Sequence, residues 1–427
     1  MESYQSSDEE FYDALEFEES EDQSCRLESQ SMILTNEVSY HKTSEDYNST
    51  SFFGNHKTLD FSSVNNLRTY KKPQPDFEGL KLVQEIELTC RGNCARWVTK
   101  FSPDSRFLVV SGDCGYMALF EVLGHRGSHS TLLRSVPSLT VPTPPISEIA
   151  WNYQGTQFLT ACLDGSVKLW RPDKESHLSV FPHAFPVNSV VFHPHNSDYF
   201  VTASQDKILR LFKLSEKRID GFYMASDEVN TIEYSINGKY LAAGLVKGQV
   251  LIYESRSTDF KLRLNNELLC RNRYGFKRRG RKVTGLSFLN DELLLITTND
   301  SRLRLYKFLE GEMLQKYKGT YNSRFPLRGS FSQDFKHILC GSEKGKVFIW
   351  NTLADKPDKK NDSYEVFDVR KRKVVEYAMF APENTVNLIN NAMSGQKQEI
   401  KHIILCLGLK EKLRVFYNLP DNAISNH

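Results

Sequence analysis

The sequence predicts an all-β protein, a seven-bladed β-propeller, on three observations. Two similar segments follow one another, from Lys282 to Tyr306 and from Leu327 to Trp350. The aromatic residue that closes each segment recurs along the chain, and a strand-like segment near residue 81 is suited to closing a ring. A unit this small cannot bury both of its faces alone, so copies of it stack on one another, and seven such copies close into a propeller.

The two segments share a pattern of three strands joined by tight turns. Side chains alternate in character from Val283 to Phe288, which suits a pleated strand whose residues point to opposite faces. A polar turn, a continuous apolar run, a second polar turn and a strand ending in an aromatic residue follow. Each segment is therefore an antiparallel sheet that lacks its fourth strand.

The closing aromatic residue occurs seven times, at intervals of 41 to 66 residues. These intervals resemble those of WD40 repeats, with insertions in the longer ones. The clearest repeat runs from Ile146 to Trp170. The resemblance implies a structural aspartate in a tight turn six residues before the aromatic residue, a position that is filled by Asp164, Asp206 and Asp300. The seven aromatic residues are Phe120, Trp170, Phe212, Tyr253, Tyr306, Trp350 and Phe416.

One strand from the start of the propeller is expected to complete its last blade. Eleven residues follow Phe416, so we expect that blade to lack an outer strand of its own, and Lys81–Leu88 alternates as that strand should. The proline-rich stretch from Leu123 to Thr143 is interpreted as a surface insertion. The expected organisation is a disordered tail over residues 1–80, the propeller over 81–418 and a C-terminal tail over 419–427.

Composition favours a cytoplasmic protein without a cofactor. The 427 residues hold no apolar run of the roughly 18 residues that a membrane span needs, and no secretory signal is visible. Eight cysteines lie mostly in predicted strands, which indicates reduced core thiols. Cys90 and Cys94 have no second pair of ligands at matching spacing, so we expect no metal site.

Charge divides the chain into an acidic tail and a basic body. Residues 1–25 contain ten Asp or Glu and no Lys or Arg, so the net charge of +2 becomes +12 without them. Residues 1–80 are rich in Ser, Glu, Asp, Asn and Thr and have no sustained apolar period, which predicts disorder.

A short motif lies within the acidic tail. It resembles the "two phenylalanines in an acidic tract" motif, and its six defined positions are met by Glu10, Phe11, Tyr12, Asp13, Ala14 and Glu16. The resemblance implies binding to the cytosolic domain of VAP, a tail-anchored receptor of the endoplasmic reticulum. Phe11 is the expected apolar anchor, because buried aromatic side chains usually carry most of the affinity of an interface. The alternative is an ordinary acidic tail that contains two aromatic residues.

The third repeat places His183, Ser204 and Asp206 where WD40 repeats have a buried hydrogen-bond network. Phe212 replaces the tryptophan of that network, so we expect His183 and Asp206 to pair across the turn. A catalytic triad is the alternative interpretation, which we reject because these positions lie inside a blade. Trp170 and Trp350 are expected in the same structural role.

A basic loop separates the fourth and fifth repeats. Its possible ligands are an anionic phospholipid, an acidic protein or, less expected, nucleic acid; the alternative is a solvated loop. The segment from Phe276 to Gly280 is similar to a motif of phosphoinositide-binding propellers, which Lys277 interrupts. A second basic cluster, Val369–Lys373, is expected to share its face. The cationic residues of the loop are Arg271, Arg273, Lys277, Arg278, Arg279, Arg281 and Lys282.

The segments T-N-D-S-R-L-R-L-Y and C-G-S-E-K-G-K-V-F-I-W, within Gly280–Trp350, resemble the family of WD repeat-containing protein 44, the rabphilin-eleven type. Val190–Phe200 and the N-terminal E-E-F-Y-D-A continue the likeness. The resemblance implies an adaptor of endosomal recycling that binds VAP and a Rab GTPase of recycling endosomes. The family's long segment before the propeller is expected to be reduced here to about sixty residues.

The leading hypothesis is thus a non-enzymatic tether between endosomes and the endoplasmic reticulum, peripherally associated with both membranes. The alternatives are a phosphoinositide-binding propeller and a general WD40 interaction scaffold. An enzyme is the least favoured class, because the sequence shows no phosphate-cradling loop, no metal-ligand cluster and no recognisable nucleophile.

Overall fold

A computed structural model describes the chain from Phe77 onwards, with gaps. All described residues belong to the compact unit formed by Lys72–His427. The tail motif and most of the basic loop lie outside the described residues. The described residues are 77, 80–88, 94, 96–123, 132–136, 143–270, 281–353, 364–369, 374–392, 400–408 and 412–418.

The unit consists of seven antiparallel sheets of four strands each, as predicted. Blade 1 comprises β2 (Trp97–Phe101), β3 (Phe107–Gly112), β4 (Met117–Val122) and β5 (Leu133–Val136). Blade 2 comprises β6 (Ile146–Trp151), β7 (Phe158–Cys162), β8 (Ser166–Trp170) and β9 (Ser179–Pro182). Blade 3 comprises β10 (Val187–His193), β11 (Asn196–Ser204), β12 (Ile208–Lys213) and β13 (Arg218–Met224). Blade 4 comprises β14 (Val229–Tyr234), β15 (Tyr240–Leu245), β16 (Gln249–Ser255) and β17 (Leu262–Leu269). Blade 5 comprises β18 (Val283–Phe288), β19 (Leu293–Thr298), β20 (Arg302–Lys307) and β21 (Glu312–Tyr317). Blade 6 comprises β22 (Gly329–Phe331), β23 (His337–Gly341), β24 (Lys346–Asn351) and β25 (Glu365–Asp368); blade 7 comprises β26 (Val375–Phe380), β27 (Ile403–Gly408), β28 (Lys412–Asn418) and β1 (Leu80–Glu87).

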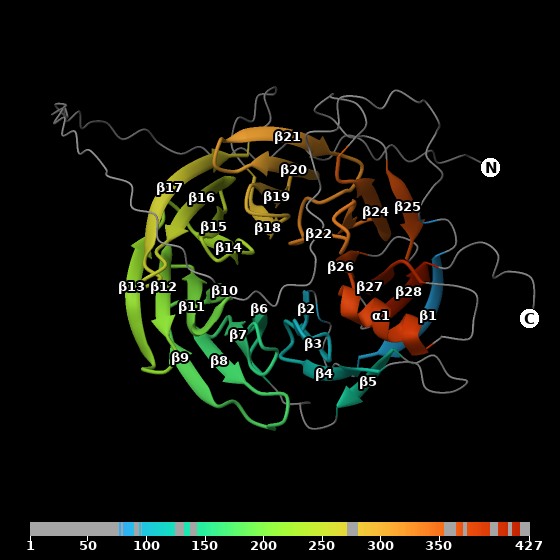
Figure 1. The fold of residues 1–427 in the computed structure, drawn as a ribbon, viewed down its shortest axis with the longest axis horizontal. Helices are drawn as coiled ribbons and strands as arrows, with labels where there is room; N and C mark the ends of the chain where they lie inside the picture. The colour runs from blue at the N-terminus through green and yellow to red at the C-terminus, as the bar shows by residue number, and fades with distance from the viewer. Residues whose placement is uncertain are drawn as a thin grey trace, which may run out of the picture. The chain divides into compact units, whose positions relative to one another are not determined.

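The first strand of each blade lies innermost, and these inner strands form a closed cycle. Each touches the inner strand of the next blade, from β2 through β6, β10, β14, β18 and β22 to β26, and β26 contacts β2 again. Figure 1 shows the resulting ring of blades. We call the centre of this ring, between the inner strands, the central channel. All seven predicted closing aromatic residues lie on the third strand of a blade, and all are buried.

The ring closes as the sequence predicts. β1 pairs in antiparallel fashion with β28, from Leu80 opposite Asn418 to Glu87 opposite Lys412. Lys412 Nζ lies 2.6 Å from Glu85 Oε1, and Arg414 Nε lies 2.7 Å from Glu85 Oε2. The outer strand of the last blade therefore comes from the start of the propeller, and backbone and side chains together join the two ends.

Side chains of the inner strands fasten blades 2 to 5 each to the next blade. Each donor sits near the start of its strand, and each acceptor is a backbone carbonyl at the start of the following blade. Such bonds satisfy buried polar groups that the sheets alone leave unpaired. They are Ser147 Oγ to Val187 O (2.5 Å), Asn188 Nδ2 to Val229 O (2.9 Å), Asn230 Nδ2 to Val283 O (2.7 Å) and Thr284 Oγ1 to Leu327 O (2.6 Å).

Two predicted loops contain regular structure. The stretch interpreted as an insertion, Leu123–Thr143, includes β5, the outer strand of blade 1. The strand was missed because four residues are too few to show alternation. It is also held by β1, since Gln84 Nε2 donates to Leu133 O at 2.9 Å. The longest interval between aromatic residues contains α1 (Glu383–Ala392), whose Val386 and Ile389 are buried.

The cysteine prediction was wrong for one pair. Cys94 and Cys114 form a disulfide, with their Cα atoms 5.3 Å apart. Cys94 precedes β2 and Cys114 lies in the turn after β3, so strand pairing brings them together from twenty positions apart. Cys162, Cys270, Cys340 and Cys406 are free and buried.

Candidate interaction surface

The predicted turn aspartates lie between the second and third strands of their blades. Asp164 Oδ1 accepts hydrogen bonds from Ser166 N at 2.9 Å and from Ser166 Oγ at 2.6 Å. This pattern holds a tight turn because a short polar side chain replaces a backbone partner. Asp164 is thus a structural residue of blade 2.

Asp206 and Asp300 hold their turns together with an arginine that sequence analysis did not identify. Arg210 Nη2 lies 2.5 Å from Asp206 Oδ2. Arg304 forms the same ion pair with Asp300, and its side chain is 1% exposed. The signal was present in the sequence as an Asp followed four positions later by an Arg, at the same place in two repeats.

The expected pair between His183 and Asp206 does not form. His183 Nε2 lies 2.9 Å from Thr202 Oγ1, and Arg210 takes the place beside Asp206. Ser204 Oγ donates to Asp206 Oδ1 at 2.5 Å, so its proton is not shared with a histidine as a triad requires. This network stabilises a blade.

The two predicted structural tryptophans use their indole N–H groups differently. Trp170 Nε1 donates to Thr160 Oγ1 at 2.9 Å within its own blade. Trp350 Nε1 donates to Lys318 O at 2.9 Å, in the segment that follows the outer strand of blade 5. Both side chains are fully buried, which agrees with a structural role.

We define the connection face as the end of the ring that carries the turns between second and third strands and the connections between blades. Cys270, the last described residue before the basic loop, donates its N–H to Gly248 O in such a turn of blade 4 (2.8 Å). Val369, which opens the second basic cluster, does the same to Gly345 O in blade 6 (3.1 Å). Both basic segments therefore leave their blades at the connection face.

Two cations lie on this face at the mouth of the channel. Lys282 directly precedes β18, and its carbonyl oxygen accepts a hydrogen bond from Asn299 N at 3.0 Å. Arg96 has the equivalent place in blade 1, where its carbonyl oxygen accepts from Asp113 N at 3.0 Å. Burial and the nearby Arg96 guanidinium lower the pKa of Lys282, while Glu228 opposes them. Asp113, Glu376 and Glu148 act in the same way on Arg96, where they oppose the lowering of its pKa by burial and by Arg328.

Charged side chains on or next to the inner strands interact with one another. Arg328 Nη1 lies 2.5 Å from Glu148 Oε2. Burial raises the pKa of Glu233, and the Glu233 carboxylate in turn raises the pKa of Lys100. Opposite charges thus meet inside the channel.

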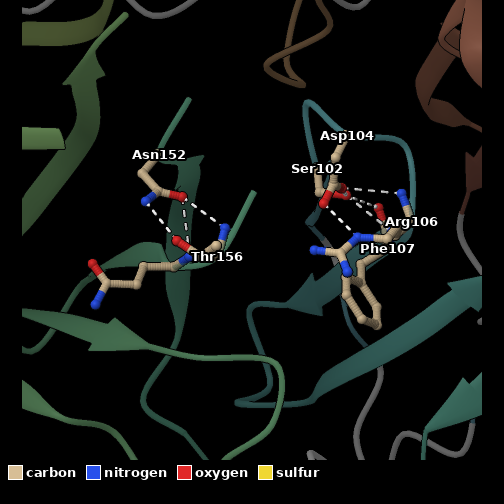
Figure 2. A network of polar contacts seen from close by, with 7 residues as sticks. Ser102, Asp104, Arg106, Phe107, Asn152 and Thr156 are labelled. Carbon is tan, nitrogen blue, oxygen red and sulfur yellow. Dashed lines mark hydrogen bonds and ion pairs between the residues drawn. The ribbon is translucent and has the colours of Figure 1, made fainter. Parts of the chain in front are cut away.

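The opposite end, the hairpin face, is built from turns between inner and second strands. Figure 2 shows two of them. Ser102 Oγ donates to Asp104 Oδ1 at 2.6 Å, and Asn152 Oδ1 accepts from Thr156 N at 3.0 Å. Exposed apolar side chains occur in these turns, including Tyr153 and Ile236. The hairpin face therefore presents apolar as well as polar side chains at its turns.

The structure describes two of the predicted residues of the basic loop, Arg281 and Lys282. Arg281 is exposed at the connection face, and Lys282 is half-buried. Arg271, Arg273, Lys277, Arg278 and Arg279 lie outside the described residues, as do Glu10, Phe11, Tyr12, Asp13, Ala14 and Glu16. Arg96 was missed because it lies at the start of the first repeat, just before β2 and far from both basic segments in the sequence.

In the part of the chain that the structure describes, no helix has the length and apolar character needed to cross a membrane.

Comparison with known proteins identifies WD40 repeats. The family model "WD domain, G-beta repeat" matches residues 134–171 and 175–213. Each match begins in or before the outer strand of one blade and continues through three strands of the next. The chain therefore carries WD40 repeats at these residues, within a propeller of seven blades.

Similar proteins share the repeat over part of their length. WD repeat-containing protein 44 of Xenopus laevis is 31% identical over 60% of this chain and 28% of its own. An uncharacterised WD repeat-containing protein of Schizosaccharomyces pombe is 24% identical over 60% of this chain and 47% of its own length. WD repeat-containing protein 82 of Drosophila melanogaster is 32% identical over 44% of this chain and 58% of its own length. The matched regions thus span about a quarter to three fifths of these relatives.

Proposed function

We propose that this protein is a non-enzymatic adaptor in membrane trafficking. Its N-terminal motif binds a VAP-type receptor of the endoplasmic reticulum, and its propeller binds a partner on recycling endosomes. The observation that carries the proposal is the motif itself: all six defined positions, Glu10 to Asp13, Ala14 and Glu16, are met within an acidic tract. The similarity to WD repeat-containing protein 44 supports it.

The chemistry of the motif suits a basic receptor. Ten acidic residues among the first 25 raise the rate of encounter with a positively charged surface, an effect that salt screens beyond about 8–10 Å. Phe11 then supplies the buried apolar contact, and Asp13 accepts hydrogen bonds from the receptor. Ordering a flexible peptide opposes binding by a few kcal/mol, so the affinity is modest.

The connection face supplies the second binding surface. Arg281 is exposed there, and Lys282 and Arg96 lie at the mouth of the channel with their charges close together. An acidic surface on a protein, including that of a Rab GTPase, fits the exposed Arg281 and the cationic residues of the basic loop that precedes it. A phosphoinositide head group is the second candidate, because Arg278 and Arg279 lie in the connection that ends at Arg281.

A pull-down with the cytosolic domain of VAP tests the first half of the proposal. Phe11→Ala and Asp13→Ala should each reduce capture at least tenfold. Phe17→Ala is the matched control, since it removes an aromatic residue from the same acidic tract outside the six defined positions. Capture of the parent chain that is no better than that of Phe11→Ala would refute this half.

Two assays separate the partners of the connection face. Flotation with phosphoinositide-containing liposomes should weaken in the variant Arg278→Ala/Arg279→Ala and not in Arg106→Ala/Lys239→Ala, which removes two cations from the hairpin face. Capture of a recycling-endosome Rab GTPase should depend on its GTP form and on Arg281 and Lys282. Arg281→Ala/Lys282→Ala is the variant for the GTPase assay. If liposome binding by Arg278→Ala/Arg279→Ala and GTPase capture by Arg281→Ala/Lys282→Ala both equal those of Arg106→Ala/Lys239→Ala, the connection face has no role in binding anions.

A further inference from the structure

Three potential metal ligands converge at the junction of blades 6 and 7. Among the described residues, the side chains of Asp334, His337 and His402 place one ligand atom each within 4.8 Å of one another. Asp334 lies in the turn after β22, His337 begins β23, and His402 directly precedes β27. Sixty-five positions separate the two histidines, so only the packing of the two blades brings them together.

The turn of blade 6 explains how a carboxylate comes to lie beside an imidazole. Ser332 Oγ donates to Asp334 Oδ1 at 2.6 Å, and His337 N donates to Ser332 Oγ at 2.9 Å. The same pattern joins Ser102, Asp104 and Phe107 in blade 1. Blade 6 thus has a histidine where blade 1 has a phenylalanine, and the shared turn holds its backbone next to the aspartate.

Aromatic packing fixes both imidazoles. The His337 and His402 ring centroids lie 5.6 Å apart at an interplanar angle of 82°. Phe77 packs on both, 5.0 Å from His337 and 5.2 Å from His402. His337 and Phe77 are buried, whereas Asp334 is exposed. The cluster therefore has an apolar wall on one side and a carboxylate facing solvent on the other.

The geometry points to a site for a divalent transition-metal ion, held by Asp334, His337 and His402 with one position open to water. Two imidazoles and a carboxylate are ligands that Zn²⁺ accepts, at bond lengths of about 2.0–2.2 Å. Tetrahedral ligands at these lengths are about 3.3 Å apart, so the ion draws the three groups together. The turn holds Asp334 Oδ1, which accepts from Ser332 Oγ and from Lys336 N, so Oδ2 is the oxygen that would bind the ion; its contact with Lys336 Nζ is long, at 3.8 Å.

An ion at this place joins two blades beside the closure of the ring. Asp334 and His337 belong to blade 6, and His402 belongs to blade 7. Phe77 lies three positions before β1, the strand that completes blade 7, and its N–H group donates to Glu365 Oε2 of blade 6 at 2.9 Å. Metal binding is thus expected to stabilise the closed ring.

Calorimetric titration of the metal-free full chain with Zn²⁺ tests the site, with Co²⁺ absorption as a second readout of ligand geometry. His402→Gln and Asp334→Asn should each weaken the tightest binding event at least tenfold. Zn²⁺ should raise the thermal unfolding midpoint of the parent chain and leave that of His402→Gln unchanged. Circular dichroism checks that each variant retains the parent fold before titration.

A second histidine pair supplies the matched control. His193 and His195 have ring centroids 6.2 Å apart, and no carboxylate joins them in a three-ligand group within the described chain. His195→Gln should therefore titrate like the parent. The site is refuted if His402→Gln also titrates like the parent, or if His195→Gln weakens binding as much as His402→Gln does.

Discussion

Arg328 and Glu148 form an ion pair across the central channel, with 2.5 Å between Nη1 and Oε2. Arg328 directly precedes the inner strand of blade 6, and Glu148 lies on that of blade 2, so the pair joins blades that are not neighbours in the ring. The Glu148 side chain is 6% exposed. Removing one partner of such a pair leaves a charge without compensation in a poorly solvated place.

Arg328→Met should therefore lower the free energy of unfolding by about 3 kcal/mol, as measured by urea unfolding followed by tryptophan fluorescence. The double variant Glu148→Gln/Arg328→Met should recover most of this loss, because neither member of the pair then remains as an uncompensated charge. Lys213→Ala is the control: it breaks an exposed pair with Glu216 and should leave the midpoint unchanged. Equal losses in Arg328→Met and the double variant would contradict the account.

The turn aspartates should differ in importance according to their arginine partners. Asp300→Ala leaves the guanidinium of Arg304, 1% exposed, without its counter-ion and should cost about 3–5 kcal/mol. Asp164→Ala removes bonds to Ser166 and should cost about 1 kcal/mol. Urea unfolding of the two variants checks the order; a larger loss for Asp164→Ala would overturn it.

Stability should fall in acid because His193 is buried in its neutral form. Burial lowers the pKa of His193 to about 4, and its ring packs against Phe260 at 4.7 Å. The unfolded chain binds a proton near pH 6.5, so this contribution is present above pH 6.5 and is lost as pH falls towards 4. Between pH 6.5 and 4.5 the free energy of unfolding should fall by about 2 kcal/mol less in His193→Phe than in the parent chain, as measured by urea unfolding at each pH. His177→Gln, on the exposed surface, should keep the slope of the parent chain.

Glu376 should have the opposite pH dependence. Burial raises the pKa of its carboxyl group to about 8, and Trp97 N donates to Glu376 Oε2 at 2.9 Å. The folded pKa exceeds the unfolded value of about 4.3, so the contribution is complete below pH 4 and is lost as pH rises through 8.

Glu376→Gln keeps the acceptor for Trp97 and cannot ionise. Its free energy of unfolding relative to the parent should rise by about 3 kcal/mol between pH 5 and pH 8.5, as measured by urea unfolding. Glu310→Gln, at an exposed ion pair with Lys307, should show no such rise. A constant difference across this range would mean that Glu376 is already ionised at pH 5.

Several features of the ring were predictable because they depend on local pattern. The aromatic residues from Phe120 to Phe416 marked all seven third strands, since each strand must bury one large side chain between neighbouring blades. The alternation of Lys81–Leu88 identified the closing strand, because a pleated strand shows its two faces in its own sequence. Asp164, Asp206 and Asp300 were found because a tight turn restricts which residues it accepts.

Other features exist only because blades meet. Glu148 and Arg328, like His337 and His402, lie far apart in the chain, and no local pattern says which inner strands face one another across the channel or which turn lies beside which blade. The short strand β5 and the Cys94–Cys114 disulfide likewise depend on neighbours brought in by folding. The sequence by itself thus determined the blades and their number, whereas the tertiary structure decided the contacts between blades, because those depend on packing geometry that the chain does not state locally.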